Sequence, residues 1–120
     1  MRLPWGITLD IQADDILLTI DTAVPCGLIL NELVSNALKH AFPNGKGGQI
    51  QIKIHEDGES HVTLAITDDG IGFPADLDFS NTNSLGLQLV NSLVNQLDGI
   101  IEIACNGETE FKITFSTLQE

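Results

Sequence analysis

Basic residues are scarce in this sequence: five lysines and arginines stand against 17 aspartates and glutamates over 120 residues, a formal net charge of −12. So few cations cannot neutralise the several phosphates that a nucleic acid presents, and the same deficit disfavours an anionic membrane surface. DNA, RNA and membranes are therefore poor candidates as partners, and we expect no direct membrane contact. A chain of this charge that binds an anion must use backbone amides, a few side chains and a divalent cation.

Cysteines and long apolar stretches are also few. Cys26 and Cys105 are the two cysteines, and neither belongs to a CxxC or Cys/His cluster. Zinc and redox chemistry are therefore not indicated, and both side chains are expected to be buried as small apolar groups. No apolar stretch is long enough for a membrane span, and the first residues do not resemble a signal peptide. We expect a cytoplasmic location, with a membrane-anchored parent protein left open.

Alternating apolar and polar residues predict six half-buried strands. Asp57-Gly58 and Asn106-Gly107 predict tight turns, and hence antiparallel hairpins, between the third and fourth and between the fifth and sixth strands. The inward-facing residues of the six strands are Ile7/Leu9/Ile11, Ile16/Leu18/Ile20, Ile50/Ile52/Ile54, Val62/Leu64/Ile66, Ile101/Ile103/Cys105 and Phe111/Ile113/Phe115.

Two segments with helical spacing interrupt the strands, one from about Thr22 to Phe42 and one from about Leu85 to Leu97. Pro43-Asn44-Gly45 is expected to end the first helix and Asp98-Gly99 the second. One-sided alternation in the strands predicts a sheet with one packed face and one wet face. The length suits one domain over residues 1–120. The predicted fold class is therefore α/β (α+β), a two-layer sandwich with a mixed, mostly antiparallel sheet and the helices on one face.

The first predicted helix has an apolar face and a polar face. A row of carboxylate, amide and ammonium groups is either an ordinary solvated face or a site for a metal-bound phosphate, and both interpretations stay open here. In the second case Asn36 supplies a neutral oxygen to Mg²⁺. The apolar face comprises Leu30, Leu33/Val34, Ala37 and Ala41, and the polar face comprises Glu32, Asn36, Lys39 and His40.

Two glycine motifs follow later in the chain. Asp68-Asp69-Gly70-Ile71-Gly72 ends the fourth predicted strand, where it forms either a plain turn or a site in which Asp68 accepts a hydrogen bond from an exocyclic amine. Ser84-Leu85-Gly86-Leu87 begins the second predicted helix, whose free amides and dipole favour an anion; the alternative is an ordinary helix start. The absence of GxxxxGK[ST], and of GxGxxG after a strand, excludes the P-loop and dinucleotide-binding folds.

These segments stand in the order found in sensor histidine kinases and resemble their nucleotide-binding boxes. The segment Asn31-Glu32-Leu33-Val34-Ser35-Asn36-Ala37-Leu38-Lys39-His40-Ala41-Phe42 is similar to the N box. The motif at 68–72 resembles the G1 box, Leu85-Gly86-Leu87 resembles the G2 box, and Gly107-Glu108-Thr109-Glu110-Phe111 resembles the terminal threonine box. The resemblance runs from about residue 16 to residue 115.

The resemblance implies the Bergerat ATP-binding fold, shared with gyrase, mismatch-repair and chaperone ATPases, and with it ATP and Mg²⁺ as ligands. It implies that Asp68 binds the adenine amino group with Thr109 nearby. Glu32 matches the acidic residue that polarises the accepting imidazole in histidine kinases. The implied catalytic residues are Glu32, Asn36 and Lys39, with Asn36 as the Mg²⁺ ligand. The other implied nucleotide contacts are Gly70 and Gly72 at the ring, Lys39 and His40 at the phosphates, and Ser84, Leu85, Gly86 and Leu87 at the phosphate tail.

The sequence departs from the common family pattern in three places. Ser84 stands where many kinases have the first glycine of the G2 box, and Glu108 stands where a second glycine is common near the threonine box. No separate phenylalanine-rich box precedes the G2 box, and the segment between the G1 and G2 boxes is short. These features resemble the short-lid histidine kinases, including the HWE-like group.

The histidines indicate whether this chain carries the residue that the family phosphorylates. His40, His55 and His61 are the three present, and none lies on a helix before the first strand, where the family's phosphoacceptor hairpin belongs. His55 and His61 flank a predicted turn and are expected to be surface residues. The resemblance therefore implies a catalytic domain that donates the γ-phosphoryl group of ATP to a histidine on a separate dimerisation/phosphoacceptor domain of the same protein, with a response regulator as an indirect partner.

Two functions of other classes stay open. A stand-alone anti-sigma-factor-type serine kinase uses the same fold, and it differs from a sensor kinase in lacking a histidine-bearing helix pair upstream. A non-enzymatic nucleotide-sensing module is the other, and phosphotransfer to a supplied phosphoacceptor domain would eliminate it. A hydrolase such as gyrase fits least, because the chain is small and carries no transducer domain.

Overall fold

The computed structural model describes residues 6–38, 47–70, 85–105 and 107–117, with the side chain of residue 105 excepted. Within these ranges, five strands form one sheet in the order β1-β2-β3-β5-β4. Strands β1 and β2 pair in parallel, and every other neighbouring pair is antiparallel. The elements in chain order are β1 (Ile7–Ala13), α1 (Ile20–Asn36), β2 (Gly48–Glu56), β3 (His61–Asp68), α2 (Leu85–Gln96), β4 (Ile100–Cys105) and β5 (Thr109–Ser116).

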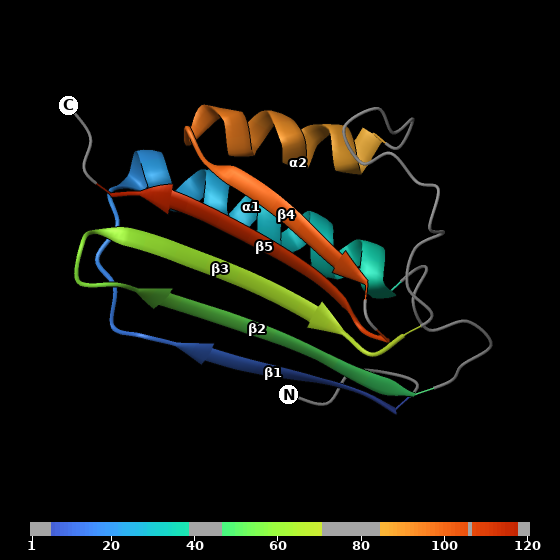
Figure 1. Cartoon of the computed structure of the whole chain (residues 1–120). Helices are drawn as coiled ribbons and strands as arrows, with labels where there is room; N and C mark the ends of the chain where they lie inside the picture. Colours follow the sequence, from blue (N-terminus) through green and yellow to red (C-terminus); the bar gives the residue numbers. More distant parts are fainter. Residues whose placement is uncertain (1–5, 39–46, 71–84, 106, 118–120) are drawn as a thin grey trace.

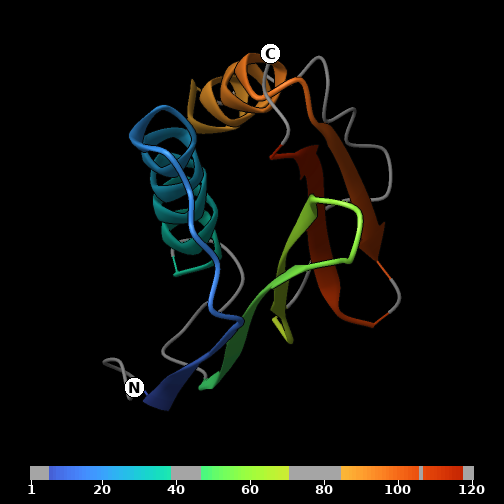
Figure 2. The same cartoon turned by 90° about the vertical axis from the view of Figure 1, so that its left-hand side faces the viewer.

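Both helices lie on the same face of the sheet and contact each other (Figures 1 and 2). The strands alternate accordingly: in β3, Val62, Leu64 and Ile66 are buried toward the helices, whereas Thr63 and Ala65 are only partly covered on the other face. The predicted two-layer sandwich with a mixed, mostly antiparallel sheet is therefore confirmed.

The core lies between the two layers, and Ile113 on β5 is at its centre with no exposed surface. We predict that Ile113→Ala lowers the free energy of unfolding by about 2–5 kcal/mol, because it removes buried methylenes and leaves a cavity. Ile100→Ala on the adjacent strand is the matched control, since that side chain is 65 % exposed and its loss should cost less than about 1 kcal/mol. Chemical denaturation of both variants measures the difference, and equal losses would place the core elsewhere.

The strand predicted at Ile16/Leu18/Ile20 is wrong. The Asp14 N–H donates to the Ile54 carbonyl at 2.9 Å, after which the chain leaves the sheet and reaches α1. Ile16 and Leu18 pack against the core, whereas Leu17 is 94 % exposed. An extended connection can thus alternate between core and solvent without a neighbouring strand, which is the pattern that misled the prediction.

Helix α1 begins two residues before its predicted start. Thr19 is the N-cap residue in an extended conformation, and its carbonyl accepts the Ala23 N–H at 2.8 Å. The helix ends at Asn36 and continues as a wider turn over residues 37–38, so the predicted extension to Phe42 lies beyond the described residues. Ile29 is fully buried beside Leu33, and the apolar stripe therefore includes a residue that the sequence interpretation did not name.

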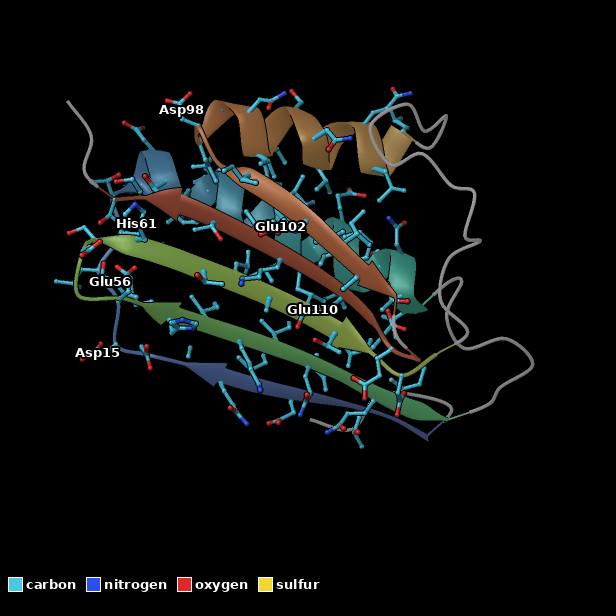
Figure 3. All side chains as sticks on the ribbon, in the orientation of Figure 1. Asp15, Glu56, His61, Asp98, Glu102 and Glu110 are labelled. Carbon is cyan, nitrogen blue, oxygen red and sulfur yellow. The ribbon has the colours of Figure 1, made fainter. Side chains whose placement is uncertain are left out.

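The second helix and the first hairpin follow the sequence closely. Helix α2 ends in a turn where Asp98 has a positive φ of 53° and the Gly99 N–H donates to the Val94 carbonyl, as predicted for this pair. At the β2–β3 turn, Asp57 accepts hydrogen bonds from two backbone amides. His55 and His61 beside this turn are exposed, as expected. Figure 3 labels His61 at this end of the sheet. Asn106, in the second predicted turn, lies outside the described residues.

Cys26 is half-buried on α1, and burial raises the pKa of its thiol to about 11. The thiol therefore stays protonated at neutral pH and behaves as a small apolar group, broadly as expected. The side chain of Cys105 lies outside the described part of the chain. None of the helices within the described ranges is long and apolar enough to cross a membrane.

Candidate nucleotide site

Four chain segments meet at one end of the molecule. The C-terminal end of α1, the N-terminal end of α2, the end of β3 and the start of β5 all lie on the right-hand side of Figure 1. The antiparallel pairing of β3 with β5 and the contact between the two helices bring them together. The described parts of the motifs between residues 32 and 109 are therefore assembled at one end of the fold.

Asp68 and Thr109 form a buried polar pair at this end. They are direct partners in the β3–β5 register, and their exposed fractions are 5 % and 1 %. Their burial follows from the strand alternation, because both occupy the inner-face positions that apolar residues hold elsewhere in β3 and β5. Within the described part of the chain, the Thr109 Oγ1 atom is buried without a hydrogen-bond partner. An unsatisfied buried hydroxyl costs free energy, so the pair is suited to a ligand that supplies the missing bond.

The Asp68 carboxylate accepts one backbone hydrogen bond and lies in surroundings that disfavour its negative charge. Its Oδ1 atom accepts the backbone N–H of Gly70 at 3.0 Å. Burial raises the pKa of Asp68 above its usual 3.8, the Gly70 hydrogen bond opposes that shift, and the nearby charges of Asp69 and Glu108 add to it. A buried carboxylate of this kind gains from a ligand that donates a hydrogen bond to it.

An adenine edge matches this arrangement. Its exocyclic amine can donate to the carboxylate of Asp68, and its ring nitrogen can accept from the Thr109 hydroxyl. Guanine presents a carbonyl oxygen at the corresponding position, which would meet the carboxylate acceptor to acceptor. The pair therefore favours adenine over guanine.

The second half of the site lies where the start of α2 meets the polar face of α1. A Cβ atom placed on Gly86 would stand 2.7 Å from Glu32 Oε2 and 3.8 Å from both polar side-chain atoms of Asn36. Glu32 and Asn36 are half-buried. The bare backbone of Gly86 thus lies directly against a carboxylate and an amide.

Leu85, Gly86 and Leu87 form the first turn of α2, the end of a helix whose dipole and backbone amides favour an anion. The side chain of Leu87 is buried in the core and that of Leu85 is 81 % exposed. Either residue can therefore contribute to an anion site at this helix start only through its backbone.

We predict that Gly86→Ala slows phosphoryl transfer about tenfold, because the new methyl group displaces the Glu32 carboxylate. The free energy of unfolding should change little, since the displaced atom is the end of a flexible side chain and alanine favours a helix. Gly27→Ala on α1 is the matched control, because nothing lies within 4 Å of its added methyl group. Equal transfer rates in the two variants would contradict the idea that transfer depends on the close approach of Gly86 to Glu32.

Several predicted site residues lie outside the described part of the chain: Lys39, His40, Gly72 and Ser84. The structure therefore brings together Glu32, Asn36 and Gly86 as one group and Asp68, Gly70 and Thr109 as another. Over the described ranges, no group of three His, Cys, Asp or Glu side chains could hold a metal ion.

Asp69 makes a contact that the sequence interpretation missed. The motif at 68–72 includes this residue but assigns it no role, whereas in the structure its Oδ1 atom accepts the Gln49 N–H at 2.7 Å. The signal was an aspartate directly before a glycine at a strand end, because aspartate side chains bond nearby backbone amides in turns.

Comparison with known proteins identifies the family of the chain. The sequence profile of the family described as "Histidine kinase-, DNA gyrase B-, and HSP90-like ATPase" matches residues 22–119. The chain is 32 % identical over 102 residues to blue-light-activated histidine kinase 2 of Erythrobacter litoralis, a match that covers 85 % of this chain and 30 % of the relative. It is 37 % identical over 81 residues to the sensor histidine kinase PdtaS of Mycobacterium tuberculosis, covering 66 % of this chain and 16 % of that protein.

Solved structures show the same fold. The blue-light-activated histidine kinase of Erythrobacter litoralis superposes with a TM-score of 0.88 at 30 % identity, over 93 % of this chain and 36 % of that one. The histidine kinase AdeS of Acinetobacter baumannii superposes with a TM-score of 0.79 at 20 % identity, over 95 % of this chain and 56 % of that chain, a likeness of fold alone. The chain spans less than a third of the length of the curated relatives given above. It belongs to the histidine kinase-, DNA gyrase B- and HSP90-like ATPase family, as an ATP-binding catalytic domain of the sensor histidine kinase type.

Proposed function

We propose that residues 1–120 form one catalytic domain that binds ATP with Mg²⁺ and donates the γ-phosphoryl group to a histidine on a separate phosphoacceptor domain. The observation that carries this proposal is the buried Asp68 carboxylate opposite Thr109, whose hydroxyl has no hydrogen-bond partner among the described residues. Glu32, Asn36 and the bare backbone of Gly86 lie at the same end of the fold. A base-recognition pair thus lies at the same end of the fold as a glycine whose backbone approaches Glu32 and Asn36.

The residues divide between the base and the phosphates. Asp68 and Thr109 bind the adenine edge, while Gly70 and Gly72 let the backbone approach the ring. The amides of the turn from Ser84 to Leu87 receive the phosphates, together with Lys39 and His40. These assignments need little net positive charge, which suits a chain with a formal charge of −12.

Asn36 is the proposed protein ligand of Mg²⁺. Its neutral amide oxygen beside Gly86 suits this ion, which takes one or two protein oxygens and fills its remaining positions with phosphates and water. When bound, the ion neutralises charge on the phosphate oxygens.

Glu32 acts on the acceptor. It lies one helical turn before Asn36, and both side chains face Gly86, so a carboxylate stands beside the place assigned to the γ-phosphate. We assign it the task of orienting the incoming imidazole and holding the proton on its far nitrogen. A bond then forms between the near nitrogen and phosphorus as the bond to the β-phosphate oxygen breaks and ADP leaves.

The partners follow from the same chemistry. The curated relatives are sensor histidine kinases, and this chain matches less than a third of their length. We propose a dimerisation/phosphoacceptor domain of the same protein as the direct partner and a response regulator as the indirect one. Because the proposed reaction consumes ATP, we propose a cytoplasmic location for the domain.

The test is phosphoryl transfer from γ-labelled ATP to the histidine-bearing domain of the parent protein. We expect a label that acid removes and alkali leaves in place, as is typical of a phosphoramidate. An acid-stable label would instead favour the serine-kinase alternative. Nucleotide binding without any transfer would contradict the kinase proposal and favour a sensing module.

A further inference from the structure

We propose that Asp69 is a positioning residue for the nucleotide site. Its carboxylate takes the place of its own backbone carbonyl at the end of the β2–β3 ladder, which lets the chain turn and fixes the neighbouring Asp68. The inference rests on the proposed role of Asp68 as the adenine-binding residue.

The hydrogen bonds at the end of β3 carry the argument. Gln49 and Asp69 form the next pair after the partners Ile50 and Asp68 in the antiparallel register. In a regular ladder such a pair exchanges two backbone hydrogen bonds. The Asp69 N–H does donate to the Gln49 carbonyl at 3.2 Å, but the Gln49 N–H donates to the Asp69 side chain at 2.7 Å. One side-chain oxygen has replaced a backbone carbonyl.

The other end of the same ladder shows the same replacement. The Asp57 N–H donates to the His61 carbonyl at 2.9 Å, and the His61 N–H donates to Asp57 Oδ1 at 3.0 Å. There the substitution accompanies the tight turn of the hairpin, where the chain also leaves the ladder at once. An aspartate carboxylate thus ends the ladder on both sides, and on the side of Asp69 the next described residue is Gly70, which contacts Asp68.

The consequence for Asp68 lies in the next residue. The Asp69 carbonyl is not needed as a ladder acceptor, so the chain can turn sharply, and the Gly70 N–H donates back to Asp68 Oδ1 at 3.0 Å. Asp69 is therefore joined to Gln49 on β2 by two hydrogen bonds, and the next residue, Gly70, donates to the side chain of Asp68. With Oδ1 held in this way, Oδ2 is the oxygen that we assign to the adenine amine.

Three variants separate the position of the acceptor from its charge. Asp69→Asn keeps an oxygen at the δ position and removes the charge, whereas Asp69→Glu keeps the charge and moves the oxygen by one methylene. Asp69→Ala removes both. If the acceptor position matters, Asn retains wild-type affinity for ADP within about twofold, and both Glu and Ala weaken it about fivefold.

Asp57→Ala is the matched control. It removes the same kind of hydrogen bond from the same ladder, about 26 Å from Asp69 along the strands. The labelled neighbours Glu56 and His61 mark that end in Figure 3. We expect Asp57→Ala to bind ADP as the wild type does. Loss of affinity in this variant as well would attribute the effect to general destabilisation and overturn the proposal.

Hydrogen exchange of the Gln49 amide provides a readout that needs no nucleotide. The amide should exchange slowly in the wild type and in Asp69→Asn, and faster in Asp69→Glu and Asp69→Ala. An unprotected Gln49 amide in the wild type, or an Asn variant that behaves like Ala, would overturn the proposal. So would wild-type affinity in Asp69→Ala despite fast exchange. If the wild type binds no ADP, the proposed function fails, while the exchange data still decide whether Asp69 ends the strand.

Discussion

Asp68→Asn should weaken ADP binding about 100-fold, because the amide that replaces one carboxylate oxygen would face the adenine amine donor to donor. The site is buried, with Asp68 5 % exposed, so water cannot readily replace the lost bond. Calorimetric titration of ADP into the wild type and the variant measures the effect. Asp57→Asn is the matched control, since it makes the same chemical change at an exposed aspartate and should bind as the wild type does.

The same variant should not lose stability. Burial raises the pKa of Asp68, so between its usual pKa and the raised value the folded state binds more protons than the unfolded state. The contribution of Asp68 to the free energy of unfolding therefore falls as pH rises through that window. At neutral pH, Asp68→Asn removes the cost of burying this charge. We expect the free energy of unfolding of the variant, measured by chemical denaturation, to equal or exceed that of the wild type. Weak binding combined with unfolding of the variant would mean that Asp68 has a structural role instead.

Acidification should weaken ADP binding to the wild type, as Asp68→Asn does at neutral pH. Protonation of Asp68 removes the acceptor that the adenine amine needs, so ADP affinity should decline as pH falls through the raised pKa. Because the pKa lies above the usual 3.8, the decline should begin at a higher pH than for an ordinary aspartate. An affinity that is independent of pH across this range would contradict the assignment.

Glu32→Gln should slow phosphoryl transfer about 100- to 1000-fold, the largest effect that we expect on the rate. The change keeps the shape of a side chain that lies against Gly86 but removes the base that holds the imidazole proton. ADP affinity should stay within about twofold, because the carboxylate is assigned to the acceptor and not to the nucleotide. Single-turnover transfer to the phosphoacceptor domain, alongside ADP titration, separates the two quantities.

Glu56→Gln is the control for this change, because Glu56 is exposed at the opposite end of the sheet (Figure 3). A loss of ADP–Mg²⁺ affinity in Glu32→Gln equal to the loss of rate would reassign Glu32 to the metal or the phosphates. Unchanged transfer would remove it from the mechanism.

The fold could be predicted where local chemistry and packing agree. Asp57-Gly58 and Asp98-Gly99 act through residues adjacent in sequence, and both turns were predicted. The segment at Ile16/Leu18/Ile20 failed because Ile16 and Leu18 meet the core from an extended connection, and alternation does not report whether a neighbouring strand is present. Ile20, the third residue of the pattern, is exposed at the start of α1. Thr19 capped a helix there in place of continuing a strand.

The site shows a similar division. Glu32 and Asn36 could be named from their spacing, because both lie on α1. The contact of Gly86 with Glu32 joins α2 to α1, and the bond from Gln49 to Asp69 joins β2 to the end of β3. Neither follows from a pattern within one segment. Such contacts depend on strand order and helix packing, which periodicity does not determine.

Titration of the wild-type chain with ADP and with GDP, each with and without Mg²⁺, tests the central claim most directly. The account predicts saturable ADP binding that Mg²⁺ strengthens, and GDP binding weaker by about 100-fold, because guanine offers the Asp68 carboxylate an acceptor in place of a donor. Equal affinity for the two nucleotides, or no binding of ADP at millimolar concentration, would contradict the assignment of Asp68 and Thr109 as an adenine site.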